Sequence, residues 1–251
     1  MKIYSKEDFA KLRVAGKLAA SVLDYITPYV KAGVSTLELN DIAHEFIIKN
    51  GAESACLNYQ GYPKSVPISV NDVICHGIPS KKEILKDGDI LNIDVTVIKD
   101  GYFGDTSRMY TVGNVSKENL DLIKITYDAM MKAISIVKPG VPLSAIGKAI
   151  ESVVLPKGYG IVKEFAGHGI GTTFHEEPNI LHYYANYYDK IIMKEGMVFT
   201  IEPMINLGKE SLYIQNDGWI ARTKDGKNSA QFEHMVGVTK KGCEIFTLSN
   251  T

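Results

Sequence analysis

Apolar and polar positions along the chain predict amphipathic helices that alternate with short strands. The first helix is predicted from four apolar positions near the start of the chain: Phe9, Leu12, Val14 and Leu18. Farther along, residues 90–98 (ILNIDVTVI) are rich in β-branched residues, as a strand is. Residues 230–238 (AQFEHMVGV) alternate with a period of two, which predicts a second strand with two distinct faces.

Two segments of the chain nearly repeat each other. Residues 30–51 (VKAGVSTLELNDIAHEFIIKNG) align without a gap with residues 137–158 (VKPGVPLSAIGKAIESVVLPKG). Each segment reads as a turn, a helix capped by Ser35 or Ser144, and a glycine stop. The alternative is that two similar amphipathic helices match by chance.

The residues that follow the two helices favour a true repeat. Residues 87–95 (DGDILNIDV) and 195–203 (EGMVFTIEP) each read as an acid–glycine turn and a strand that ends in an acid. Aligning the two glycines places Asp94 on Glu202. We therefore expect a pseudo-twofold α+β fold, in which helices cover one face of a curved, largely antiparallel sheet and the acids line the other.

Length and composition are those of an ordinary globular protein. The chain has 251 residues, of which 45% are hydrophobic and 23% are charged, enough for a substantial core. We expect a single domain over residues 1–251, built from two pseudo-symmetric halves at roughly residues 10–110 and 120–245.

Charge and cysteine content argue against several classes of protein. The net charge is −1 and no sizeable basic patch is implied, so nucleic acid is not an expected partner. The N-terminal stretch lacks the long apolar core of a signal peptide, and no apolar run is long enough to span a bilayer. Three scattered cysteines do not make a disulfide framework, which favours a cytoplasmic location: Cys56, Cys75 and Cys243.

A predicted hairpin carries two acids. Residues 99–102 (KDGY) are a tight-turn signal, and a two-residue turn at their centre pairs Thr96 with Asp105 and Asp94 with Ser107. Asp94 and Asp105 then become diagonal neighbours on one face, within reach of a shared cation. A register slip of one residue would place them on opposite faces, and Asp105 could instead be a solvated turn acid.

Five residues together make a ligand set for two divalent cations: Asp94, Asp105, His168, Glu202 and Glu233. Asp94 and Glu202 interrupt strongly apolar strands, and a lone buried acid is costly without a partner or a metal. Four converging acids would repel one another unless cations lay between them. If the five converge, the chain is a two-metal hydrolase.

Other candidates are weaker when taken alone. His168 and His175 lie in a glycine-rich run (FAGHGIGTTFHEEP), where a histidine is more often a polar loop residue. Glu233 shares a strand face with Gln231 and could be an outward-facing acid, and nothing around His76 identifies it as a ligand. The aromatic residues of the segment 59–62, with Phe174 and Trp219, either pack in the core or line an apolar pocket.

Several long motifs, in order, resemble the type I methionine aminopeptidases. They are NYQGYPKSVPISVNDVICHGIP, LNIDVTVIKDGYFGDTSRMY, GHGIGTTFHEEP, FTIEPM and AQFEHMVGVT. The resemblance runs from the N-terminal helix to about residue 247 and implies the pita-bread fold, a pseudo-symmetric α+β domain. Without an N-terminal extension or the large insertion of the type II enzymes, the chain is similar to the short bacterial form.

The resemblance implies roles for the five ligands. Asp105 and Glu233 would bridge two divalent ions, Asp94 would chelate one ion, and His168 and Glu202 would complete the other. Carboxylates and imidazole suit Mn, Fe, Co or Zn, and the sequence leaves the choice open. A structural monovalent cation is a further expectation, at Asn71, Val73 and Ser229.

The resemblance also implies substrate-binding residues. His76 would lie near the scissile amide nitrogen, and His175 would help to bind the scissile carbonyl oxygen. The methionine side-chain pocket would include five residues: Cys56, Tyr59, Tyr62, Phe174 and Trp219. The chain departs from close relatives at Gln60, where they often carry His, and at Pro67, where they often carry Cys.

The implied activity is removal of the initiator methionine from nascent proteins, with a preference for a small second residue. A hydroxide between the two metals would attack the first peptide bond, and Glu202 would move a proton from the attacking water to the leaving amine. The expected partners are methionyl peptides and nascent chains, with a transient ribosome contact. No membrane or nucleic acid is expected, and a monomer is expected by analogy.

Three other functions stay open at this point. A proline-specific peptidase of the same fold, such as an aminopeptidase P or a prolidase, would usually have a large extra N-terminal domain, for which this chain has no room. A binding module of this fold would have lost metal ligands, and all five candidates are present. A metal-storage or purely structural protein would not need the aromatic residues or His76.

Overall fold

The computed structural model describes residues 2–249 of the chain. Its helices are α1 (Lys6–Ile26), α2 (Thr36–Lys49), α3 (Lys117–Ser135) and α4 (Ser144–Val154). Short 3₁₀ turns occur at η1 (Thr27–Tyr29), η2 (Tyr59–Gly61), η3 (Leu155–Lys157) and η4 (Asn186–Lys190). The strands are β1 (Glu53–Ser54), β2 (Ile68–Val70), β3 (Val73–Cys75), β4 (Ile90–Lys99), β5 (Tyr102–Thr111), β6 (Gly160–Ile161), β7 (Gly167–Gly169), β8 (Glu176–Ile180), β9 (Val198–Ile201), β10 (Met204–Asn206), β11 (Leu212–Ile214), β12 (Ala221–Thr223), β13 (Ser229–Gln231), β14 (Glu233–Val238) and β15 (Cys243–Ile245).

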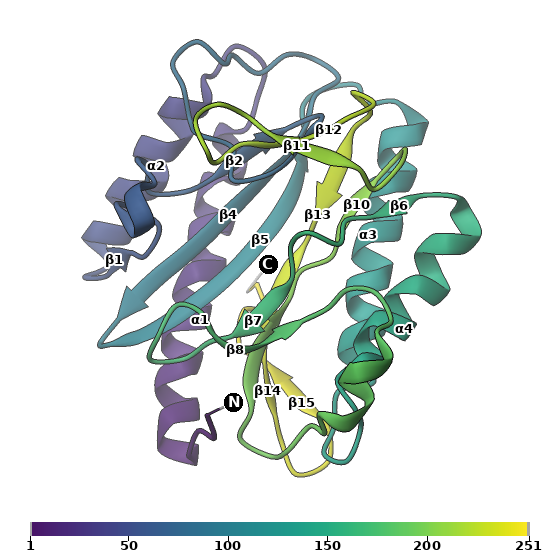
Figure 1. Ribbon diagram of the computed structural model, residues 1–251. Coiled ribbons are helices and arrows are strands. Elements are labelled where there is room, and N and C mark those ends of the chain that lie inside the picture. The colour runs from purple at the N-terminus through teal and green to yellow at the C-terminus, as the bar shows by residue number, and fades with distance from the viewer. Residues whose placement is uncertain (1, 250–251) are drawn as a thin grey trace.

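A curved antiparallel sheet forms the centre of the described chain (Figure 1). Its strands lie in the order β1-β4-β5-β14-β9-β7-β8, while β2 pairs with β4 and β15 pairs with β14. Strands from the two ends of the sequence meet in the middle, where β5 pairs with β14. Two small sheets, β13-β10-β6 and β11-β12-β3, lie beside it.

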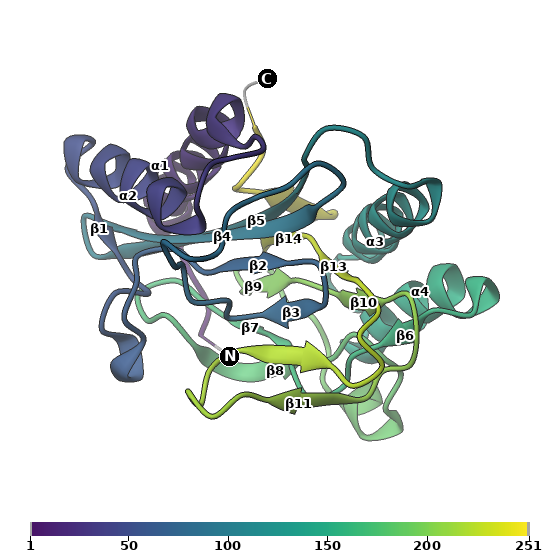
Figure 2. The same cartoon turned by 90° about the horizontal axis from the view of Figure 1, so that it is seen from above.

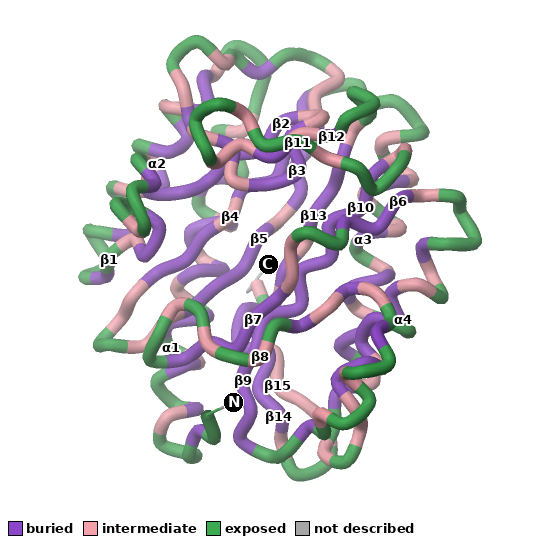
Figure 3. The backbone as a smooth tube through the Cα atoms, viewed as in Figure 1, coloured by how far each residue is buried: buried purple, intermediate pink, exposed green. Residues whose placement is uncertain are grey.

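The helices lie on the outside of this curve, and strands of the small sheets lie on the opposite side (Figure 2). One apolar core joins α1 and α2 to β2 and β4, and a second joins α3 and α4 to β9 and β14. The central strands of the large sheet, from β4 to β7 in the sheet order, are buried along most of their length, whereas β1, β8 and β15 are not (Figure 3). The expected arrangement of helices on one face of an antiparallel sheet is therefore present, and it leaves the other face free for a site.

The first helix forms as predicted, but one of its four marker positions does not face the core. Phe9 and Leu12 are buried and Leu18 is half-buried, whereas Val14 is 53% exposed. The buried stripe continues instead through small residues: Ala15 lies against Gly104 of β5, and Gly16 lies against Phe246. Ser5 caps the helix, accepting a hydrogen bond from the backbone N–H of Asp8.

The hairpin register is the one that its turn predicted. Thr96 pairs with Asp105, and Asp94 pairs with Ser107. Asp100 and Gly101 both have positive φ, at 51° and 79°, as a two-residue turn of type I′ requires. Local turn chemistry therefore set the relative position of two of the five candidate ligands.

Matching backbone hydrogen bonds relate the two halves of the chain. The N–H of Gly33 donates to Leu85 O at 2.8 Å, and the N–H of Gly140 donates to Met193 O at 3.0 Å. A second matching pair is Leu85 N to Val34 O at 2.9 Å and Met193 N to Val141 O at 2.8 Å. A third pair is Gly88 N to Val112 O at 2.8 Å and Gly196 N to Val238 O at 2.9 Å. Such a set favours a true repeat over a chance match. The single domain and its division at roughly 10–110 and 120–245 stay predictions.

One of the two predicted helix caps is wrong. Ser35 caps α2 as expected, accepting from the N–H of Glu38, whose carboxylate accepts in turn from the N–H of Ser35. Ser144 is instead the first residue inside α4, since Leu143 already has helical φ and ψ of −60° and −30°. Its hydroxyl donates to the carboxylate of Asp189 in η4.

Within residues 2–249, the structure contains no helix with the length and apolar character needed to cross a membrane.

The crossing of α1 over β5 gives a test of the fold. A Cβ on Gly104 would lie 2.3 Å from the carbonyl carbon and oxygen of Ala15, which are backbone atoms that cannot rotate away. We expect Gly104→Ala to lower the free energy of unfolding by roughly 1–3 kcal/mol or more, measured by urea denaturation.

Gly242→Ala is the matched control, because the added Cβ would meet only Val137 O, at 4.0 Å. We expect this control to change the free energy of unfolding by less than about 0.5 kcal/mol. Equal stability of the two variants would contradict the close helix–strand crossing.

Candidate metal centre and adjoining pocket

Five adjacent strands of the large sheet bring the five candidate ligands together on the face opposite the helices. The order β4, β5, β14, β9 and β7 supplies one residue each: Asp94, Asp105, Glu233, Glu202 directly after β9, and His168. Ser107 pairs with Asp94 on one side and with Glu233 on the other, so a small side chain separates these two acids. The placement of these five residues on adjacent strands is consistent with the prediction, made from the sequence, that they converge.

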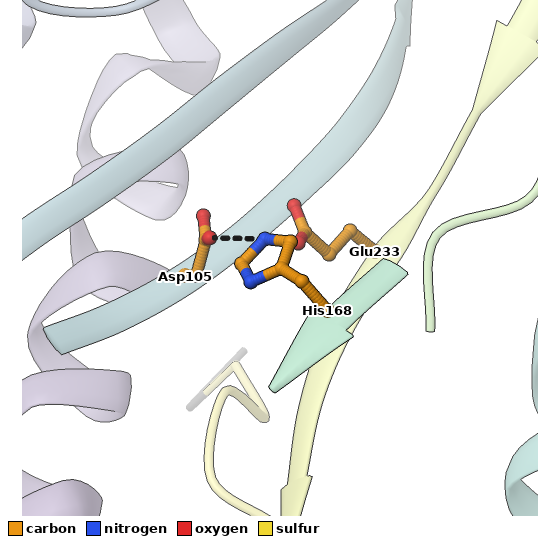
Figure 4. Close-up of side chains that lie close together, drawn as sticks. All are labelled: Asp105, His168 and Glu233. Carbon is orange, nitrogen blue, oxygen red and sulfur yellow. Dashed lines mark ion pairs between the residues drawn. The ribbon is translucent and has the colours of Figure 1, made fainter. Parts of the chain in front are cut away.

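Side-chain atoms of this group lie at distances that suit a shared cation. Asp105, His168 and Glu233 each offer one donor atom, and these atoms lie within 4.8 Å of one another (Figure 4). His168 Nε2 lies 3.6 Å from an Asp105 oxygen and 3.6 Å from a Glu202 oxygen. All four of these residues are at most 8% exposed.

His168 faces the acids with a lone pair, and this geometry fits a metal. Its Nδ1 lies 3.0 Å from the backbone oxygen of Gly169, and a carbonyl oxygen can only accept, so Nδ1 carries the proton. Nε2 is then unprotonated, because burial lowers the pKa of His168 to about 3. A lone pair between two carboxylate oxygens is unfavourable unless a cation lies between them, and a ligating histidine commonly donates its other N–H to a carbonyl.

Asp94 supplies a second sign that a cation belongs here. Its Oδ1 is buried and has no hydrogen-bond partner among residues 2–249. A buried carboxylate oxygen without a partner is costly, and a divalent metal that prefers oxygen ligands would satisfy it. The residues present therefore fit divalent metal ions.

Burial shifts the acids toward their protonated forms when only protein atoms surround them. It raises the pKa of Asp94 to about 7 and is the largest effect that raises the pKa of Glu202 to about 8. Burial, with Asp94 nearby, raises the pKa of Asp105 well above its usual range, and burial with Asp105 nearby does the same for Glu233. A group of acids that resists ionisation is stabilised in its charged form by bound cations.

Hydroxyl groups that the sequence analysis did not single out orient the ligands. Thr96 Oγ1 donates to Asp105 Oδ1 at 2.7 Å, and Thr200 Oγ1 donates to Glu202 Oε1 at 2.7 Å. Thr200 Oγ1 also accepts from the backbone N–H of His168 at 3.0 Å, which joins two ligands. Both threonines lie two positions from a ligand along the chain, so the period of two in a strand was the signal that could have found them.

A cavity of about 470 Å³ adjoins the ligands, and all seven expected substrate-binding residues line it. They are Cys56, Tyr59, Tyr62, His76, Phe174, His175 and Trp219. Phe165 and Met204 also line it and were not predicted, because no spacing in the sequence connects them to the other wall residues. The aromatic cluster is therefore a pocket wall rather than a part of the main cores.

Both departures from close relatives lie at the cavity. Gln60 and Pro67 line the same cavity. The three expected monovalent-cation residues, Asn71, Val73 and Ser229, come from neighbouring elements, and the N–H of Ser229 donates to Asn71 O at 2.9 Å. Their cation stays a prediction.

Comparisons with known proteins agree with this site. The profile of metallopeptidase family M24 matches residues 10–240. A methionine aminopeptidase from Rickettsia prowazekii (strain Madrid E) is 54% identical over 250 residues, which are 99% of this chain and 96% of the relative. A methionine aminopeptidase from Escherichia coli (strain K12) is 53% identical over 247 residues, 98% of this chain and 93% of the relative.

The fold agrees as closely as the sequence. The crystal structure of methionine aminopeptidase from Rickettsia prowazekii matches with a TM-score of 0.97 at 53% identity, covering 99% of this chain and 100% of that one. The α+β pita-bread fold that the motifs implied is confirmed by this match.

Removal of the charge of Asp94 tests its role at the centre. We expect Asp94→Asn to weaken binding of divalent ions by at least about tenfold, because the amide replaces a buried anionic oxygen that has no protein partner. Metal analysis after dialysis and calorimetric titration with Mn²⁺ would measure this.

Asp100→Asn, in the exposed turn of the same hairpin, is the matched control and should keep full metal content. Full metal occupancy in Asp94→Asn would exclude Asp94 as a ligand.

Proposed function

Because the chain belongs to metallopeptidase family M24 and, within it, to the methionine aminopeptidases, we propose that it removes methionine from the N-terminus of peptides by metal-assisted hydrolysis. The observation that carries the proposal is that all five candidate ligands line one cavity together with aromatic side chains. Nascent proteins that begin with methionine are the natural substrate class.

Two divalent ions, of Co, Mn, Fe or Zn, are the cofactors in this proposal. Asp94, Asp105, His168, Glu202 and Glu233 would hold them. When bound, such ions activate water as a nucleophile and polarise the carbonyl group of the scissile bond.

Glu202 is the residue proposed to move the proton from the attacking water to the leaving amine. Thr200 holds its Oε1 through a 2.7 Å hydrogen bond, and the Gln231 amide lies 3.4 Å from Oε2. The side chain is thus held at both oxygens while it exchanges a proton. Its place directly before Pro203 and after the buried strand β9 keeps its backbone fixed as well.

Two neutral imidazoles would contact the substrate. Burial lowers the pKa of His76 to about 4 and also lowers the pKa of His175, so both rings are uncharged near neutral pH. His76 packs edge-on against Phe165 and Trp219, which suits a role near the scissile amide nitrogen. His175 would donate a hydrogen bond to the scissile carbonyl oxygen as negative charge develops on it.

The cavity walls suit a methionine side chain. A thioether is flexible and polarizable, and it packs well against aromatic rings. The rings of Tyr62 and Trp219 meet edge-on at 5.2 Å, and the buried thiol of Cys56 lies beside them in the wall. The preference for a small second residue stays a prediction by analogy with the family.

Location and partners complete the proposal. The three cysteines are free thiols, which suits a reducing cytoplasm. A transient contact with the ribosome, a monomeric state and the absence of membrane or nucleic acid partners stay predictions by analogy.

Cleavage of short peptides tests the function directly. We expect the protein, loaded in turn with Mn²⁺, Co²⁺, Fe²⁺ and Zn²⁺, to release methionine from Met-Ala-Ser and to leave Ala-Pro-Ser intact. A proline-specific peptidase would do the reverse, and a binding module would bind no metal and cleave neither peptide.

A single isosteric change tests the proton carrier. We expect Glu202→Gln to lower kcat for Met-Ala-Ser by at least about 100-fold with an unchanged circular dichroism spectrum, because the amide cannot accept the proton of the attacking water. Metal content is measured in parallel, and the exposed Glu210→Gln variant is the control with unchanged kcat. Wild-type turnover by metal-loaded Glu202→Gln would exclude the proton-carrier role.

A further inference from the structure

A hydrogen bond joins the two halves of the chain across the mouth of the cavity. The hydroxyl of Tyr59, in η2, lies 2.8 Å from Nδ1 of His175, which directly precedes β8. The two rings are 5.2 Å apart, and both residues line the cavity. This contact determines which ring nitrogen of His175 carries the proton.

The relative strengths of the two groups favour the phenol as the donor in this bond. The oxygen of a phenol shares its lone pair with the ring, so the hydroxyl is a better donor than acceptor, whereas an unprotonated imidazole nitrogen is a strong acceptor. Within residues 2–249, the Tyr59 hydroxyl has no second hydrogen-bond partner that could take its proton. The pair is exposed, so water would accept the phenol proton in the reverse arrangement, and the assignment rests on the relative strengths of the two groups as donor and acceptor.

Both sides of the bond are held in place. The ring of Phe174 packs on Tyr59 at 4.8 Å and stacks on Phe103 at 5.7 Å. Tyr4 holds the loop that carries His175. Its hydroxyl donates to Glu176 Oε1 at 2.6 Å and accepts from the N–H of Thr172 at 2.9 Å. The loop that carries His175 is thus anchored on both sides of the histidine.

His168 and His175 then have opposite tautomers, although their rings are only 4.3 Å apart. His168 donates from Nδ1 to Gly169 O and presents a lone pair to the acids. His175 accepts at Nδ1, so its proton lies on Nε2. One ring offers a lone pair to a cation, and the other offers an N–H to an oxygen.

We propose that Tyr59 is a positioning residue for the reaction, which holds His175 in the tautomer with its proton on Nε2 so that this N–H donates to the scissile carbonyl oxygen. The assignment of the tautomer stands on the hydrogen bond alone. The catalytic consequence rests on the proposed function. This N–H stabilises an oxyanion, whereas the other tautomer would place a lone pair against the developing negative charge.

Tyr59→Phe removes the hydroxyl and keeps the ring in the pocket wall. The nitrogen-15 resonances of His175 report the tautomer, and the missing signals of His175→Gln assign them among the six histidines of the chain. The spectra are recorded on metal-free protein and on protein loaded with diamagnetic Zn²⁺. We expect a protonated Nε2 and an unprotonated Nδ1 in the wild type, and exchange between both tautomers in Tyr59→Phe.

Kinetics separate this role from pocket binding. We expect Tyr59→Phe to lower kcat for Met-Ala-Ser by about 3- to 10-fold, the range of one neutral hydrogen bond, and to change KM less than twofold. Tyr110→Phe is the matched control, since Tyr110 donates to Leu23 O at 2.8 Å on the helix-covered side of β5. It should change neither the His175 resonances nor kcat.

Two results would overturn the proposal. One is a wild-type His175 with its proton on Nδ1, and the other is a Tyr59→Phe variant with an unchanged tautomer or an unchanged kcat. Failure of the wild-type protein to release methionine with every metal would overturn the proposed function instead, and the spectra would still decide the tautomer.

Discussion

Four carboxylates on one face of one sheet, three of them buried and that of Asp94 half-buried, are the constraint on which the rest of this structure depends. Each acid alone would cost several kcal/mol to bury in charged form, and together they repel one another. Among residues 2–249, Oδ1 of Asp94 has no hydrogen-bond partner, and Nε2 of His168 carries no proton that it could donate to the acids. Protein groups therefore do not compensate this cost. Divalent cations between the acids would compensate it, which agrees with the membership of the chain in metallopeptidase family M24.

The twofold character of the fold explains how the acids meet. The matched glycine turns place Asp94 and Glu202 at equivalent positions in the two halves. Helices cover the outer face in both halves, so the polar face of each half can only point inward. The central pairing of β5 with β14 then brings Asp105 and Glu233 between those two acids.

The catalytic pocket departs from this symmetry, and its chemistry depends on that departure. His168 and His175 come from one glycine-rich run in the second half, whereas Tyr59 and His76 come from loops of the first half. A backbone oxygen contacts Nδ1 of His168, whereas a phenol contacts Nδ1 of His175. In our proposal, His168 therefore presents a lone pair and His175 presents an N–H. In this proposal, the hydrogen-bond partner of each imidazole, rather than its residue type, decides whether the ring presents a lone pair or an N–H.

Local signals in the sequence determined what short-range chemistry controls. The Asp100–Gly101 turn set the register that aligns Asp94 with Ser107, and Ser35 with Glu38 set the start of α2. The same kind of signal failed at Ser144, because the chain enters α4 already helical and the hydroxyl binds Asp189, 45 residues away. The position of Glu233 was likewise decided by tertiary structure, through a pairing with Ser107 across 126 positions of sequence (233 − 107). A turn is specified by its own residues, whereas strand order and pocket walls depend on packing between segments that no local pattern connects.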